Sequence, residues 1–131
     1  MDSAIIKSTR SGRTLTFSNR NGDYFDTELA GDSISAKKGI WGYTDTAFLI
    51  DLFDSFTRDW KGWDGERHWA AIEGDLDLTA TSDNLGHIRL DVVLLNNSPE
   101  DDLKADAQVY LDAGSLDTLA NKVRKFFTQT K

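Results

Sequence analysis

The sequence has no cysteine, and this absence excludes disulfide bonds and thiolate metal sites. A single proline excludes a proline-rich linker. No run of about 18 apolar residues is present, which excludes a membrane-spanning helix of ordinary length. The first residues, MDSAIIK, lack the basic and apolar regions of a secretion signal. Together these absences predict a cytoplasmic, bacterial-type protein that does not enter a membrane.

The residues that are present have the composition of one globular domain. The chain has 131 residues, of which 39% are hydrophobic and 28% are charged. This length gives room for one substantial core but not for two ordinary domains. We therefore expect residues 1–131 to form a single domain without internal repeats.

The net charge of −7 is concentrated in the middle of the chain. Residues 51–83 carry nine acidic against three basic side chains. A field of this sign repels phosphate groups and attracts basic surfaces, so it argues against direct nucleic-acid binding. It favours a basic protein partner. The alternative explanation is that acidic side chains here only improve solubility.

Hydrophobic patterning predicts an α+β fold. Alternating apolar and polar residues indicate antiparallel strands, in which Ile34 is expected to face the core. Apolar residues at helical spacing indicate two helices, and the apolar stripe of the first begins at Phe48. The expected strands are residues 4–8, 14–18, 24–29, 33–38, 75–81, 88–95 and 104–112, and the expected helices are 45–60 and 115–127. The predicted order is ββββ-α-βββ-α, with one antiparallel sheet of about seven strands and both helices packed on one face of it.

The segment WKGWDGERHW, residues 60–69, holds three of the four tryptophans. Helical spacing places Trp60 on the apolar face of the first helix, so we expect it in the core. Trp69 begins or precedes a strand and is expected to pack on the same helix. Trp63 stands between two glycines, where it either covers the edge of the core or contacts a partner. Trp41 and Tyr43 could extend the same aromatic surface.

No catalytic motif is present, neither a glycine-rich phosphate loop nor a nucleophile elbow. We expect no catalytic residue, metal or cofactor, and thus no enzyme. Two histidines, His68 and His87, could form a metal or acid–base site with nearby carboxylates if adjacent strands bring them together. Histidines that only form hydrogen bonds at the surface are the simpler interpretation.

Asp75 and Asp77 fall on the same face of a predicted strand, because side chains two residues apart share a face. A pair of exposed carboxylates invites a cationic partner, although it can equally be a plain solvated face. Combined with the acidic and aromatic residues before this strand, the pair defines an expected partner-binding surface. Its residues are Asp59, Trp63, Asp64, Glu66, Asp75, Asp77 and Asp83.

Five sequence blocks resemble those of an uncharacterised family of small bacterial proteins. They are NGDYF at 21–25, WGYTD at 41–45, the tryptophan block at 60–69, GDLDLTAT at 74–81 and LGH at 85–87. The resemblance spans most of the chain and implies no activity. More loosely, the size, acidity and expected architecture are similar to those of immunity proteins of polymorphic or contact-dependent growth inhibition toxin systems.

Two functional hypotheses follow. The first is an immunity-type protein that binds and neutralises a cognate toxin domain through the acidic, aromatic surface, which would complement a basic active-site cleft. The second is a small-ligand-binding protein or enzyme with a pocket near Trp63, Glu66, His68 and His87. A structural role in a larger assembly would instead require self-association or a large apolar patch.

Overall fold

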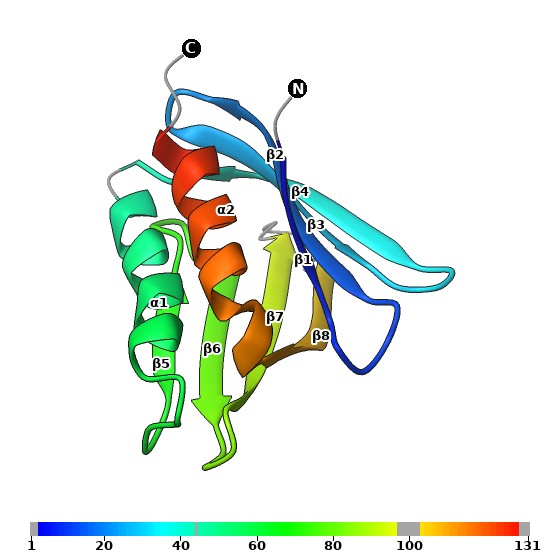
Figure 1. Ribbon diagram of the computed structural model, residues 1–131. Helices are drawn as coiled ribbons and strands as arrows, with labels where there is room; N and C mark the ends of the chain where they lie inside the picture. Colours follow the sequence, from blue (N-terminus) through cyan, green and yellow to red (C-terminus); the bar gives the residue numbers. More distant parts are fainter. Residues whose placement is uncertain (1–2, 44, 97–102, 129–131) are drawn as a thin grey trace.

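The chain folds as two successive units of four strands and one helix (Figure 1). The computed structural model describes residues 3–43, 45–96 and 103–128. Its elements are β1 (Ser3–Lys7), β2 (Thr14–Asn21), β3 (Tyr24–Ala30), β4 (Ser35–Trp41), α1 (Thr46–Arg58), β5 (Arg67–Ala70), β6 (Leu76–Ser82), β7 (His87–Asn96), β8 (Leu103–Asp112), the 3-10 turn η1 (Ala113–Ser115) and α2 (Leu116–Thr128).

The strands form two antiparallel sheets of four, in the orders β1-β2-β3-β4 and β5-β6-β7-β8. The α+β class and the antiparallel pairing are confirmed, but the single sheet of about seven strands is wrong. Helix α1 carries the chain from β4, an edge of the first sheet, to β5, an edge of the second. The additional strand is β5, which has four residues and a single buried side chain, Trp69. With only one buried residue, β5 has no alternation of apolar and polar residues from which the sequence could predict a strand.

The fourth strand also differs from its expected position. It spans Ser35–Trp41, because the preceding turn extends to Ile34 and Ala30 pairs with Ser35. Ile34, expected to face the core, is 78% exposed, while Ile40 is fully buried. The shift lengthens the β3–β4 hairpin, which projects from the body of the molecule (Figure 1).

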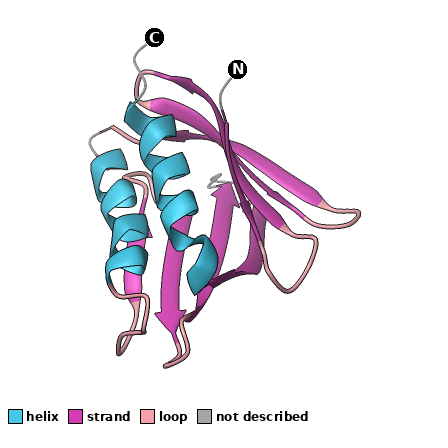
Figure 2. Cartoon of the chain, viewed as in Figure 1, coloured by secondary structure: helices cyan, strands magenta, loops and turns pink. Residues whose placement is uncertain are grey.

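Both helices lie side by side against the same face of the second sheet (Figure 2). Alternate residues of β6 and β7, from Leu76 to Leu94, point into this layer and are buried. Helix α2 also covers the first sheet. There Phe126 and Phe127 pack on Phe17, with ring centroids 6.4 and 5.5 Å away, and Phe127 meets Phe25 edge-on at 5.0 Å. One continuous core therefore joins the two sheets.

Among the described residues, polar contacts join the two sheets beyond β1 and between β4 and the start of β6. Beyond β1, the Thr9 amide donates to the carbonyl of Tyr110 on β8, and the Tyr110 amide donates to the Ser8 hydroxyl. At the other junction, Lys38 on β4 forms an ion pair of 3.2 Å with Asp75, just before β6. These contacts fix the crossing of the first sheet over the second.

Neither helix within the described ranges has the length and apolar content needed to cross a bilayer.

The first helix exposes one of its expected core residues. Phe48 lies in the first turn of α1 and is 64% exposed, whereas Leu49, Leu52, Phe53 and Phe56 form the buried stripe. In α2 the expected apolar face is buried against the core; its residues are Leu116, Leu119, Ala120, Val123, Phe126 and Phe127.

Candidate functional site

The tryptophan block forms one end of the molecule, where the α1–β5 loop meets the β6–β7 turn. Glycines make this contact possible. Gly62 has φ +115°, and a Cβ atom there would lie 2.4 Å from the carbonyl oxygen of Asp83. A Cβ atom at Gly86 would lie 2.8 Å from the carbonyl oxygen of Trp60. We call the surface formed by residues 59–66 and 83–86 the Trp60 end.

Trp60 is the exposed tryptophan of the block. Its expected place in the core is wrong: it is 50% exposed, because α1 ends at Arg58 and the helical spacing stops before Trp60. The Lys61 ammonium lies 5.4 Å from the centre of the indole ring. Leu85, in the adjacent β6–β7 turn, is 78% exposed. Two large apolar side chains are therefore presented to solvent from neighbouring loops.

Trp63, by contrast, is packed into the edge of the core. Its ring stacks on Phe56 at 5.6 Å with an interplanar angle of 4°, and the Arg67 guanidinium lies 4.1 Å from its centre. The indole Nε1 is buried and has no hydrogen-bond partner among the described residues. Of the two interpretations of Trp63, the structure supports the covering of the core edge.

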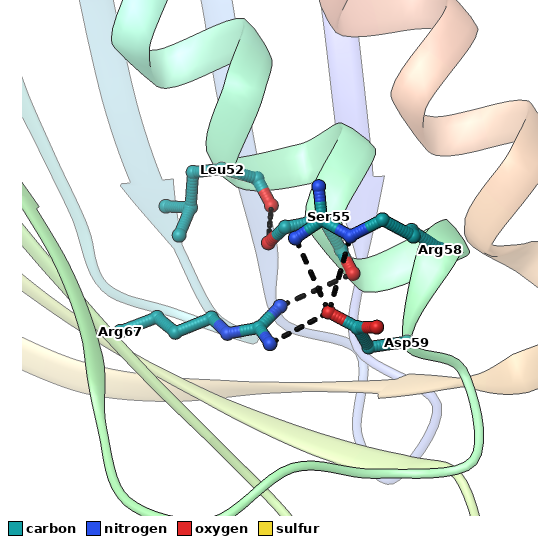
Figure 3. A network of polar contacts seen from close by, with 5 residues as sticks. All are labelled: Leu52, Ser55, Arg58, Asp59 and Arg67. Carbon is teal, nitrogen blue, oxygen red and sulfur yellow. Dashed lines mark hydrogen bonds and ion pairs between the residues drawn. The ribbon is translucent and has the colours of Figure 1, made fainter.

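Arg67 ties the end of α1 to the start of β5 (Figure 3). Its guanidinium donates to Asp59 Oδ2 at 2.7 Å and to the carbonyl oxygen of Ser55 at 3.2 Å. Arg58 donates to the same carboxylate oxygen. The hydrogen bond from Arg67, followed by that from Arg58, lowers the pKa of the Asp59 carboxyl. The Asp59 carboxylate therefore links the end of α1 to the start of β5 through Arg67.

Asp83 organises the β6–β7 turn. Its carboxylate accepts hydrogen bonds from the backbone amides of Leu85 and His87, and its second oxygen lies 2.8 Å from His87 Nδ1. The bond from the His87 amide is the largest of several contributions that lower the pKa of Asp83 to about 2. The turn is thus built around a carboxylate that stays ionised at neutral pH.

Asp64 and Glu66 are the free carboxylates of this end. Both residues are exposed. Neither has a hydrogen-bond or ion-pair partner within the described part of the chain. Their charges are available to cations of a partner, unlike those of Asp59 and Asp83.

The two remaining residues of the expected surface lie elsewhere. Asp77 is on the outer face of β6, where His68 Nε2 approaches its carboxylate at 2.8 Å. Asp75 does not share that exposed face, contrary to expectation. Its side chain is 7% exposed and pairs with Lys38, because it precedes β6 at the junction of the two sheets. The structure therefore gathers five of the seven residues, Asp59, Trp63, Asp64, Glu66 and Asp83, at one end.

The two histidines lie on the same face of the second sheet but apart. His68 on β5 is opposite Thr79, which is opposite Asp91 on β7. His87 lies four residues before Asp91 on that strand, about 13 Å along it. Each histidine pairs with its own aspartate. Within the described residues, no group of three potential metal ligands is found. A hollow lined by Asp83 and His87 does not include Trp63, Glu66 or His68.

Trp41 and Tyr43 do not extend the Trp60 end. They form a row with Tyr24, with ring centroids 6.3 and 5.3 Å apart, at the other end of α1. A helix of 13 residues spans about 20 Å, which separates this row from Trp63. Trp41 and Tyr43 therefore belong to a surface separate from the Trp60 end.

Sequence reasoning missed Trp60 and Leu85 as surface residues. For Trp60 the signal was available in Gly62, because a glycine in the left-handed region commonly follows the last turn of a helix by a few residues. For Leu85 the signal was the surrounding turn sequence, SDNLG, in which an apolar side chain has no strand face to bury it.

Comparison with known proteins identifies the family. Residues 6–130 match the model of DUF6228, described as a family of unknown function. The chain belongs to this family. A search of curated proteins found no match, and a search of solved structures found none either.

Proposed function

We propose that the protein is a non-enzymatic, immunity-type protein that binds and neutralises a cognate bacterial toxin domain. The observation that carries the proposal is the exposure of Trp60 and Leu85 on adjoining loops. Exposed tryptophan beside charged groups is typical of the residues that dominate protein–protein affinity.

The internal hydrogen bonds of the Trp60 end support binding. The loop that carries Trp60 is held by the contacts of Arg67 with Asp59 and Ser55, and the turn that carries Leu85 is held by Asp83. A surface that is already ordered loses little conformational entropy when a partner binds. The two apolar side chains would therefore contribute most of their buried area to affinity.

Charge at this end is less available than the sequence suggests. Asp59 and Asp83 are engaged in internal contacts, which leaves Asp64 and Glu66 to meet a basic toxin cleft. Exposed charges at the rim of an interface affect the association rate more than the lifetime of the complex. We therefore assign affinity to Trp60 and Leu85, and electrostatic steering to the two free carboxylates.

The first test is co-expression with the product of the gene immediately upstream. Growth rescue together with a stable 1:1 complex is the expected result. If the upstream product is harmless, or no complex forms, the pairing is rejected.

Point variants then map the surface within that complex. Trp60→Ala should weaken binding by about 30-fold or more, the loss typical of an interface hot spot. Phe48→Ala is the matched control, since Phe48 is an aromatic residue with 64% exposure at the start of α1. Asp64→Lys with Glu66→Lys should slow association and flatten its salt dependence. Equal affinities of the Trp60 and Phe48 variants would reject this surface even if the complex itself exists.

A further inference from the structure

A second surface lies between the β3–β4 hairpin and β8, away from the Trp60 end. Here the two sheets diverge and enclose a groove of about 430 Å³. Its walls carry mainly small or apolar residues, with Leu29 and Ala36 on the hairpin and Ala105 and Ala107 on β8. This volume falls within the range of ligand-binding clefts.

One wall of the groove is the open edge of a sheet. Beyond β7, the backbone of β8 is paired only in part: Tyr110 contacts Ser8 and Thr9, and the Gln108 carbonyl accepts from Arg13 at 2.9 Å. Because backbone groups of a strand point to the same edge at every second residue, Lys104 and Asp106 direct theirs outward as well.

Nothing within the described part of the chain bonds the outward amide and carbonyl groups of Lys104 and Asp106. Both residues line the groove, and Arg13 closes the end of it nearest Gln108. The groove therefore runs along the very stretch of β8 that remains unpaired. Unpaired strand edges are sites where another extended chain adds to a sheet.

Exposed apolar residues mark the groove and a smaller hollow that continues it. Ile34, at the hairpin tip, is 78% exposed and lines the groove. Leu103, the first residue of β8, is 71% exposed and lines the adjoining hollow, which shares Ala36 and Ala105 with the groove. An open strand edge flanked by exposed apolar side chains is a typical site of pairing with another chain.

We propose that this groove binds one extended peptide segment of a partner protein, which pairs with the free edge of β8 at Lys104 and Asp106. The unpaired backbone groups recognise the main chain of that segment, and the alanine-lined walls accept its alternate side chains. Charged groups at the rim balance, with Arg13 and Lys104 against Asp32 and Asp106. The segment is therefore expected to be uncharged, with apolar residues at every second position.

This inference is independent of toxin binding at the Trp60 end, and its test needs no toxin. A display library of random ten-residue peptides is selected against the purified protein, and one selected peptide is labelled for fluorescence polarisation. Asp106→Pro removes the outward amide, a change that an edge strand tolerates. Asp106→Ala is the matched control, because it removes the side chain and keeps the amide.

We expect Asp106→Pro to weaken peptide binding about tenfold or more, since a buried acceptor of the peptide loses its donor, and Asp106→Ala to stay within about twofold. Bound peptide should also slow amide exchange at Lys104 and Asp106. Equal effects of the two Asp106 variants, or selection of no binding peptide, would overturn the proposal. So would dimerisation of the free protein through this edge in sedimentation, which would assign the groove to a second copy of the chain.

A groove-filling variant keeps the test decisive if Asp106→Pro does not fold. Ala36→Trp adds bulk to the opposite wall and leaves the sequence of β8 unchanged. Thr16→Trp places the same side chain on the outer face of β2, and Thr16 does not line the groove. Binding lost in the first variant and kept in the second supports the groove. Binding kept in both rejects it.

Discussion

Arg67 lies over the indole ring of Trp63, with its guanidinium carbon 4.1 Å from the ring centre, while the same group bonds Asp59 and the Ser55 carbonyl. One side chain thus links the end of α1, the loop after it and the start of β5. The position of Trp60 depends on this link, because Trp60 lies between two of the segments that it joins.

Replacing Arg67 should destabilise the fold. Arg67→Ala should lower the free energy of unfolding by about 2 kcal/mol, because it removes charge-assisted hydrogen bonds and the contact with the ring. Lys cannot bond a carboxylate and a carbonyl with one planar group, so Arg67→Lys should recover less than half of the loss. Urea unfolding followed by tryptophan fluorescence measures both. Arg89→Ala, which breaks an exposed ion pair with Asp91, should change stability by less than about 0.5 kcal/mol.

Glycine substitutions should separate steric contact from backbone strain. Gly62→Ala combines φ +115° with a Cβ position 2.4 Å from the Asp83 carbonyl, so it should cost more than about 2 kcal/mol. Gly65→Ala carries the strain of φ +79° in open space and should cost about 1 kcal/mol. Gly114→Ala has neither and should be nearly neutral. Thermal unfolding of the three variants checks the order; a Gly65 variant as damaging as the Gly62 variant would contradict the close contact.

Removing only one partner of the ion pair between Lys38 and Asp75 should destabilise the fold more than removing both. Lys38→Met leaves a buried carboxylate without its cation and should lower the free energy of unfolding by about 3 kcal/mol. Removing the second charge with Asp75→Leu in the same chain should restore most of that loss, because no buried charge remains. A double-mutant cycle by chemical unfolding measures the coupling. Additive losses would show that the two charges do not depend on each other.

The stability that Asp83 contributes to the fold should be lost at acidic pH. Its pKa is lowered to about 2 in the folded chain from an ordinary value of 3.8. A lowered pKa stabilises the fold above the unfolded value, and this stabilisation is lost as pH falls through 3.8 toward 2. The stability difference between wild type and Asp83→Asn should therefore shrink as the pH falls from about 4 toward 2. Unfolding measured from pH 7 to pH 2 tests this; a difference that does not vary with pH would refute the hydrogen-bonded turn.

The sequence predicted those parts of the fold in which periodicity extends over several residues. The apolar stripe of α2 and the alternation of β6 and β7 gave correct faces, because each inward residue is buried between a sheet and a helix. The division into two sheets left no such pattern. It depends on where α1 redirects the chain and on β5, whose single buried residue is Trp69.

The candidate site was predicted in part for a similar reason. Acidic and aromatic residues close in sequence, from Asp59 to Glu66, also lie together in space. The exposure predicted for Asp75 is wrong, because its buried carboxylate pairs with Lys38, which belongs to the other sheet. The core position expected for Trp60 is wrong, since the helix ends at Arg58. Trp63 covers the edge of the core, one of its two expected places, because the glycines turn it back toward Phe56. Contacts of this kind are set by tertiary packing, which periodicity does not encode.

The packing of α2 on the first sheet has a consequence for synthesis. Arg20 on β2 donates to the carbonyl of Phe126, and 106 residues separate the two. At ordinary translation rates the ribosome needs about 5 to 20 seconds to make such a stretch. For that time the apolar face around Phe17 and Phe25 has no helix to cover it. We expect the nascent first sheet to be a client of ribosome-associated chaperones, released only when residues 126 and 127 emerge.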